Sequence, residues 1–218
     1  MSPSHRSEAD FRVVHALRCI GVAGEERVAT ASGLGRRDTA ARLRRLSSLG
    51  LVTLAPGPFG GWGLTEAGRA SEQDWLRVEL ELTGARDHIH RSYRSFLALN
   101  SKLLQICSDW QMIKLGPSPI LNDHRDPEYD AGVLSRLMKI EDSVQRILAE
   151  LSGRLSRFES YGSRLRNALE RTLAGDTLYL ADGLDSYHAV WFQLHEDLLA
   201  TLGISRDEER RDTSPAGS

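Results

Sequence analysis

Arginines gather on residues 36–49 and give this segment the strongest chemical character in the sequence. Its apolar positions repeat at helical spacing and predict a helix whose buried face holds Thr39, Leu43, Leu46 and Leu49. The opposite face carries Arg37, Ala41, Arg44, Arg45 and Ser48, with Arg36 at the start of the helix. Guanidinium groups chelate guanine O6 and N7 or clamp a phosphate. The segment is therefore a candidate polyanion-binding helix, and the alternative is a solvated arginine face.

A second set of residues has the chemistry of metal ligands. Two histidines lie seven residues apart on one predicted helical face, and an Asp-His pair occurs elsewhere in the chain. A metal site needs three or four donors that converge, and nothing in the spacing brings these together. The side chains concerned are His188, His195, Glu196, Asp123 and His124. We therefore predict hydrogen-bonded core or interface histidines and no metal, with a metal-responsive protein using His188 and His195 as an alternative.

The sequence lacks the motifs of common catalytic sites. No GxSxG, HExxH, P-loop or dinucleotide fingerprint occurs, and the GPFGG stretch at 57–61 lacks the Lys-Ser/Thr that phosphate chemistry requires. Cys19 and Cys107 have no CxxC spacing and lie on apolar helical faces, which is typical of inert buried thiols. The sequence predicts neither an enzyme nor a cofactor.

Charge is distributed unevenly along the chain. Of the 218 residues, 28 are Lys or Arg and 30 are Asp or Glu, giving a net charge of −2. Residues 1–70 carry +4, from 10 basic and 6 acidic side chains, and residues 71–218 carry −6. The first part could therefore meet a polyanion. Without an apolar run of membrane-spanning length or a secretory signal, we expect a cytoplasmic protein with no membrane partner.

The first seventy residues predict three short helices and a hairpin. The helices are expected over 8–22, around Val28–Ser32 and over 36–49, with Gly33 closing the second. Residues 51–54 and 62–64 read as two strands joined by the APGPFGG turn. Thr65 is a good N-cap for the helix that follows. This order is the layout of a winged helix-turn-helix over residues 8–70.

Two stretches carry a family resemblance. TAARLRRLSSLGLV at 39–52 and WGLTEAGR at 62–69 resemble the MarR-like winged-helix family of bacterial transcriptional regulators in their leucine spacing, in Gly50 and in the LT-x-x-G turn. The resemblance covers about the first third of the chain. It implies that the third helix lies in the major groove of double-stranded DNA, with the DNA-facing positions Arg36, Arg37, Ala40, Ala41, Arg44 and Arg45.

The hairpin departs from the family pattern. Winged-helix regulators often carry an arginine at the wing tip for the minor groove, whereas the predicted wing residues Pro58, Phe59 and Gly60 are uncharged. We expect Trp62 to pack rather than to contact DNA. DNA affinity would then depend mainly on the arginines of the third helix.

Residues 71–204 predict an all-α helical bundle, so the fold class is mainly α. Its first long helix has a seam of apolar side chains broken only by Asn100, and Asp126 before Pro127 is a strong helix start. A helix is expected to run from there through Phe158, another over 161–174, and a last one over 184–203. The stretches FLALNSKLLQICSDWQ, LNDHRDP and HAVWFQLHEDLLATLG look similar to the C-terminal region of uncharacterised winged-helix regulators from high-GC bacteria.

The last predicted helix has two apolar faces. One face holds Leu184, Tyr187, Trp191, Leu194 and Leu198, and the other holds His188, Phe192, His195 and Leu199. A helix that is apolar so far round must be covered on both sides, so we expect one face to close the bundle and the other to join a homodimer. The charged residues 205–218 read as a disordered tail.

Polar residues among aromatics suggest a site for an effector. A small-molecule pocket is expected around Tyr93, Asn100, Trp110, His188, Trp191 and His195. Asn100 could instead be a satisfied core residue. The sequence thus predicts a homodimeric DNA-binding transcriptional regulator that responds to a small molecule. The alternative from another class is a protein-interaction module whose arginines meet an acidic partner.

Overall fold

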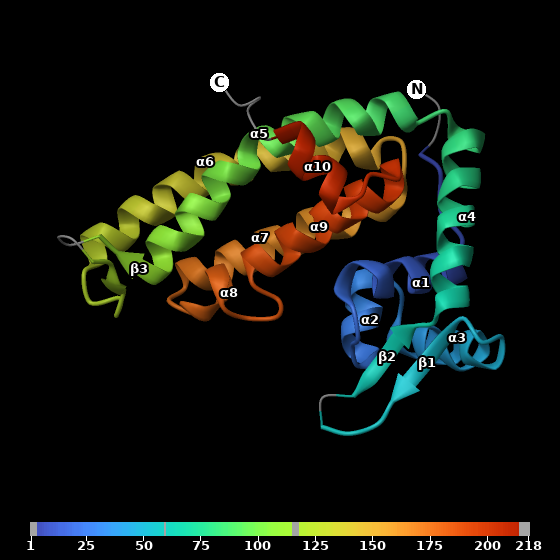
Figure 1. Cartoon of the computed structure of the whole chain (residues 1–218). Helices are drawn as coiled ribbons and strands as arrows, with labels where there is room; N and C mark the ends of the chain where they lie inside the picture. The colour runs from blue at the N-terminus through green and yellow to red at the C-terminus, as the bar shows by residue number, and fades with distance from the viewer. Residues whose placement is uncertain (1–3, 59, 115–117, 214–218) are drawn as a thin grey trace. The chain divides into compact units, whose positions relative to one another are not determined.

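The computed structural model describes residues 4–58, 60–114 and 118–213 (Figure 1). The chain is mainly helical, which confirms the predicted fold class at this level. Its contacts divide it into two units. Unit 1 comprises residues 1–90, 154–157 and 193–218, and unit 2 comprises 91–153 and 158–192. The division therefore does not follow the boundary expected after residue 70, because segments far along the chain pack into unit 1.

Unit 1 begins with the three helices expected from the sequence. These are α1 (Ala9–Ile20), α2 (Glu25–Ser32) and α3 (Arg36–Ser48). Gly21 and Gly33, with φ of 72° and 64°, end the first two helices in a conformation that other residues rarely adopt. The buried face of α3 consists of Thr39, Leu43 and Leu46, so the helical spacing predicted this face correctly except for Leu49, which is exposed.

A two-stranded hairpin follows α3 and packs on the same core. β1 (Val52–Ala55) pairs antiparallel with β2 (Gly61–Leu64), so that Val52 lies opposite Leu64. Trp62 is 7% exposed and lies in one cluster with the buried residues Val13, Val14, Leu17, Ala23, Val28, Leu43, Leu46 and Val52. Trp62 therefore packs, as expected, but within the core of its own unit and not on the neighbouring domain that the sequence suggested.

A third short segment extends the hairpin. The Ala23 amide donates to Trp62 O at 3.0 Å, and the Trp62 amide donates to Ala23 O at 2.8 Å. A Cβ atom at Gly61 would lie 2.7 Å from the Ala23 carbonyl carbon, so only glycine permits this approach. The sequence analysis missed this bridge, because a single paired residue leaves no periodic pattern.

The helix α4 (Glu66–Thr83) starts at a close junction with the hairpin. The Gly68 amide donates to Thr65 Oγ1 at 3.0 Å, and Thr65 Oγ1 in turn donates to Leu51 O at 3.1 Å. Thr65 is therefore the predicted N-cap. The helix ends at Gly84, where φ is 58°.

Unit 2 contains most of α5 (Arg86–Gln111), then α6 (Pro127–Ser152), α7 (Glu159–Leu173) and α8 (Leu178–Ala181). A small hairpin of β3 (Met112–Ile113) and β4 (Ile120–Leu121) joins α5 to α6. The seam of α5 is buried as predicted, at Ile89, Tyr93, Phe96, Leu103, Cys107 and Trp110. Asp126 caps α6 by accepting from the amides of Glu128 and Tyr129.

Three expectations for the helices were wrong in detail. α6 ends at Ser152 instead of continuing through Phe158, and a 3-10 turn, η1 (Ser156–Phe158), separates it from α7. The helix expected over 161–174 was predicted to bury an apolar seam of Leu165, Leu169 and Leu173, but Leu173 is 50% exposed. Residues 206–213, expected to be disordered, form α10 (Arg206–Thr213), because Glu209 is buried against His195. Residues 214–218 lie outside the described residues.

The last long helix, α9 (Tyr187–Leu202), is buried over much of its circumference. Its first predicted face is buried at Tyr187, Trp191, Leu194 and Leu198, while Leu184, which precedes the helix, is 69% exposed. On the second face, His195 and Leu199 are buried but Phe192 is 51% exposed. The exposed apolar surface of the second face is thus narrower than the sequence suggested and includes Phe192.

Candidate functional site

The exposed face of α3 is the surface that the sequence singled out. Arg37, Ala41, Arg44 and Ser48 are all exposed and follow one line along the helix, because they are spaced by three or four residues. No acidic side chain among the described residues lies within ion-pair distance of Arg37 or Arg44. Their guanidinium groups are therefore free to bind an external anion.

Two other arginines of the predicted set are already engaged. Arg36 forms an ion pair with Glu26 of α2, and Arg45 forms one with Asp10 of α1. Arg42, which the sequence analysis did not select, also contacts Asp10 at 2.7 Å and Asp38 at 2.9 Å. Ala40 is half-buried beside the exposed line. Of the four predicted arginines, Arg36 and Arg45 are therefore ion-paired to neighbouring helices. Arg37 and Arg44 have no ion pair among the described residues.

The predicted wing tip is an uncharged turn closed by a backbone hydrogen bond. Pro58 is exposed, and the Gly60 amide donates to Gly57 O at 2.9 Å, which closes the turn. A Cβ atom at Gly60 would lie 2.2 Å from Ala55 O, so the turn requires glycine there. Phe59 lies outside the described residues.

Two residues of the expected effector pocket, Asn100 and Trp191, bond to each other in unit 2. Trp191 Nε1 donates to Asn100 Oδ1 at 2.9 Å, and the Trp191 ring stacks on Phe96 with centroids 4.5 Å apart. Trp110 Nε1 donates to Thr177 O at 3.0 Å. Asn100 is therefore a satisfied polar residue of the helical core, which was the alternative to a pocket. Tyr93 is buried and His188 is half-buried.

His195 belongs to unit 1 and has partners of its own. Its Nε2 lies 2.6 Å from Glu209 Oε1, and its Nδ1 lies 3.1 Å from Arg206 Nη1. Burial lowers the pKa of His195, although the Glu209 carboxylate opposes this shift. His124 pairs instead with Asp130 at 3.0 Å. The structure therefore gives each of these two histidines a carboxylate partner of its own.

Unit 1 also contains a buried group of polar side chains that the sequence analysis missed. We call it the buried polar cluster; its members are Ser7, His15, Glu72, Glu79, Arg157, Asp197 and Thr201, each 7% exposed or less. They come from four separate parts of the chain, namely the N-terminal segment with α1, then α4, η1 and α9. The members are ordinary polar residues that lie far apart in the chain, so no sequence signal marks the cluster.

His15 lies at the centre of the cluster, between two carboxylates. Its Nδ1 is 2.7 Å from Glu72 Oε1, and its Nε2 is 3.0 Å from Asp197 Oδ1. Burial alone would lower the pKa of His15, but Cys19 and Asp197 outweigh it and raise this pKa well above the ordinary value. The imidazole is therefore held in its protonated, charged form.

Arg157 compensates part of the remaining negative charge. Its Nε donates to Glu79 Oε2 at 3.1 Å, its Nη2 donates to Thr201 Oγ1 at 2.7 Å, and its Nη1 forms an ion pair with Asp197. Burial would raise the pKa of the Asp197 carboxyl, but Arg157 and His15 hold it well below its ordinary value. Arg157 thereby ties three segments of unit 1 together.

Two members of this cluster, together with the neighbouring Cys19, have the composition of a metal site. His15, Cys19 and Asp197 each place a donor atom within 4.8 Å of the others, and no other such group occurs in the described part of the chain. However, Arg157 Nη1 lies 3.2 Å from His15 Nε2, so a guanidinium already fills the space beside this nitrogen. A protonated imidazole also has no lone pair to offer. We interpret the group as a structural ion-pair network.

The protonated state of His15 predicts a pH-dependent stability. Because its folded pKa is raised, the stabilising contribution is fully present below the unfolded pKa of about 6.5 and is lost as pH rises through the folded value. Urea unfolding should therefore show that His15→Gln costs more free energy of unfolding at pH 6 than at pH 9. Equal costs at both pH values would contradict a charged His15.

Comparison of the chain with known protein families, curated proteins and solved structures gives no match. Its function is therefore argued from its own geometry. Among the described helices, none has the length and apolar character needed to cross a bilayer. The chemical features of the described residues are two arginines without ion pairs on α3, an uncharged turn between β1 and β2, and the buried polar cluster.

Proposed function

We propose that this protein is a DNA-binding transcriptional regulator that acts as a homodimer. In this proposal α1, α2, α3 and the β1–β2 hairpin form a winged helix-turn-helix, and α3 is the helix that enters the major groove. The supporting observation is the line of Arg37, Ala41, Arg44 and Ser48 along α3, exposed at every position and with both guanidinium groups unpaired among the described residues. Two cations separated by small side chains suit a groove lined with phosphates and acceptor-rich base edges.

The arrangement around α3 also suits this role. The buried face of α3 is fixed by Leu43 and Leu46 in the core of unit 1, so the exposed arginines project from a rigid support. Arg45 and Arg42 are held by Asp10 and orient α3 against α1. The uncharged hairpin tip adds shape, and backbone amides there could contact phosphates without adding a salt-sensitive charge.

Dimerisation is part of the proposal because helix-turn-helix proteins read two half-sites about one turn of DNA apart. Phe192 of the predicted dimer face on α9 is 51% exposed. Replacing Phe192 by Glu should therefore shift the protein toward the monomer in sedimentation experiments.

The direct test uses purified full-length protein and selection of bound duplexes from fragmented genomic DNA. The expected result is a preferred duplex whose affinity falls steeply with salt, because each phosphate contact releases condensed counterions. Arg37→Ala combined with Arg44→Ala should weaken binding about 100-fold and lower the salt slope, since each arginine contact contributes about 1–3 kcal/mol. The proposal is refuted if no duplex is preferred or if DNA affinity does not change with salt concentration.

A matched control separates this surface from a general loss of charge. Arg91→Ala combined with Arg94→Ala removes the same charge from exposed positions of α5 and should leave DNA affinity unchanged. Equal losses in both double variants would show that only net charge matters. Arginine-dependent binding to an acidic protein, without any preferred duplex, would instead identify the protein-interaction module.

A further inference from the structure

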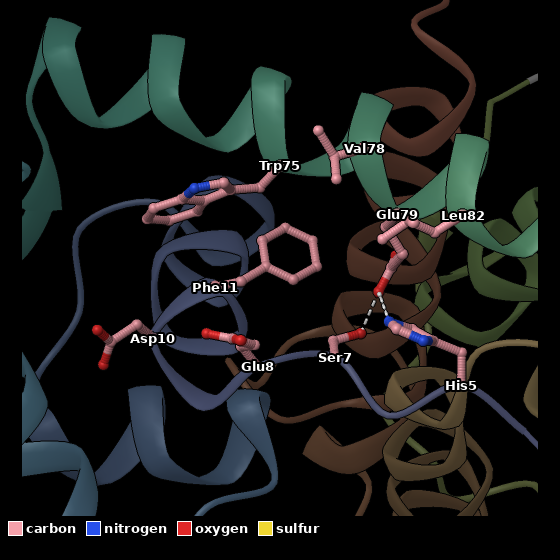
Figure 2. A pocket seen from close by; sticks show the side chains of 9 residues that line it. All are labelled: His5, Ser7, Glu8, Asp10, Phe11, Trp75, Val78, Glu79 and Leu82. Carbon is pink, nitrogen blue, oxygen red and sulfur yellow. Dashed lines mark hydrogen bonds and ion pairs between the residues drawn. The ribbon is translucent and has the colours of Figure 1, made fainter.

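Unit 1 contains a cavity of about 380 Å³ whose lining includes Asp10, the residue that holds Arg42 and Arg45 of α3. The N-terminal segment, the start of α1 and one face of α4 line it. Its lining residues are His5, Ser7, Glu8, Asp10, Phe11, Trp75, Val78, Glu79 and Leu82. Figure 2 shows Trp75 and Phe11 close together, Glu8 and Asp10 on one side of these rings, and Glu79 with Ser7 and His5 at the other end. The cavity has the size of a small organic ligand.

The aromatic wall of the cavity is preformed. The Phe11 and Trp75 rings meet edge to face, with centroids 6.2 Å apart and an angle of 80° between their planes. Arg157 lies over the Phe11 ring, 5.9 Å from its centroid. Val78 and Leu82, 41% and 74% exposed, extend the apolar surface along α4. Such a wall binds the apolar body of a ligand, and the indole face also attracts a cation.

Three carboxylates complete the lining, and they differ in how far they are compensated. Glu79 is neutralised inside the buried polar cluster by Arg157. Asp10 is shared between Arg42 and Arg45 of α3. Glu8 is exposed, and no cationic side chain lies within ion-pair distance of it in the described part of the chain. Neither lysine nor arginine lines the cavity, so its uncompensated charge is negative.

We infer that this cavity binds a small organic cation with an aromatic or branched apolar body. The apolar part lies against Trp75 and Phe11, and the positive charge faces Glu8 and Asp10. A neutral ligand of the same shape gains only the apolar contact, and an anion meets the Glu8 carboxylate. The ligand class is thus selected by charge as well as by shape.

The cavity is connected to α3 through a single carboxylate. Asp10 lines the cavity and at the same time holds Arg45, whose side chain is 59% exposed. A bound cation competes with Arg45 for Asp10 and releases this arginine toward the DNA phosphates. The cation is then a ligand that strengthens DNA binding. This coupling step rests on the proposed function. By linkage, DNA must strengthen cation binding by the same factor.

The binding step is tested without DNA, by calorimetric titration of the full chain with phenyltrimethylammonium. Its carbon isostere tert-butylbenzene and the anion benzenesulfonate serve as comparison ligands. The expected result is saturable binding of the cation, with the isostere at least fivefold weaker and no binding of the anion. Absence of cation binding at millimolar concentration, or equal binding of the isostere, overturns the inference.

Variants locate the bound cation. Glu8→Gln and Trp75→Leu should each weaken cation binding at least fivefold, whereas Glu170→Gln, an exposed control on α7, should not change it. Glu8→Gln is the decisive variant, because Glu8 is exposed and its replacement leaves no buried charge. Unchanged binding in Glu8→Gln and Trp75→Leu overturns this location.

The coupling step is tested on a duplex obtained by selection. Phenyltrimethylammonium should raise DNA affinity at least threefold. Asp10→Asn should raise DNA affinity in the absence of the cation and remove the effect of the cation. Bound cation with unchanged DNA affinity overturns the coupling and leaves the binding site standing. If the protein binds the cation but prefers no duplex, the proposed function and the coupling are both refuted. The cation site shown by calorimetry is not affected by that result.

Discussion

Arg157→Met is expected to lower the free energy of unfolding by about 3–5 kcal/mol, because it leaves the buried carboxylate of Glu79 without its guanidinium and removes one of the two cations beside Asp197. Both carboxylates are 5% exposed or less, and Arg157 is the guanidinium that contacts both of them. Methionine fills much of the volume of the removed side chain, so the loss measures charge and hydrogen bonding more than packing. Urea unfolding at pH 7, followed by circular dichroism, gives the value.

Two further variants make this prediction specific. Arg154→Met, an exposed neighbour in the same short segment, should change the free energy of unfolding by less than about 0.5 kcal/mol. Combining Arg157→Met with Glu79→Gln and Asp197→Asn should recover part of the loss, because the uncompensated charges are then gone. A cost of Arg157→Met no larger than that of Arg154→Met would show that the buried polar cluster does not stabilise unit 1.

Gly68→Ala should also destabilise unit 1, by about 3 kcal/mol, since it forces a side chain into the junction between the hairpin and α4. An ideal Cβ at this position lies 2.0 Å from Leu51 O and 3.0 Å from the Leu51 carbonyl carbon. Both are backbone atoms, so the clash cannot be relieved by turning a side chain. The substitution must shift β1 or the start of α4, where Thr65 bonds to Leu51 O at 3.1 Å.

The control for Gly68→Ala is the same substitution at another helical glycine. Gly132 lies in α6 with open space where a Cβ would be placed. Gly132→Ala should therefore stabilise the protein by about 0.5–1 kcal/mol through helix propensity alone. Thermal unfolding of both variants compares them directly. If both substitutions raise the melting temperature, the close approach at Gly68 is not a feature of the folded protein.

Local pattern predicted most of the individual elements. Apolar residues at helical spacing indicated α3 and α5 with their buried faces, and glycine and threonine signals indicated the end of α2 and the start of α4. The sequence was less informative where an element ends for a nonlocal reason. Continuing the periodicity past Ser152 missed the turn at η1, whose Arg157 is required by partners on other helices.

In the candidate sites too, local features were predictable from the sequence and nonlocal contacts were not. Helical spacing was enough to place Arg37 and Arg44 on one exposed face, but not to distinguish them from Arg36 and Arg45. That distinction depends on Glu26 and Asp10, which lie on neighbouring helices. The sequence also did not predict the hydrogen-bond partners of the residues expected to line an effector pocket. Asn100 accepts from Trp191, and His195 bonds to Glu209.

The sequence by itself determined most of the long helices, the β1–β2 hairpin, the basic face of α3 and the uncharged turn, because each depends on residues within a few positions of one another. Only the tertiary structure decided which arginines are free, which polar residues share a buried network, and where a cavity forms. These features join residues as far apart as His15 and Asp197. Such contacts arise from the packing of whole helices, and spacing along the chain carries no record of them.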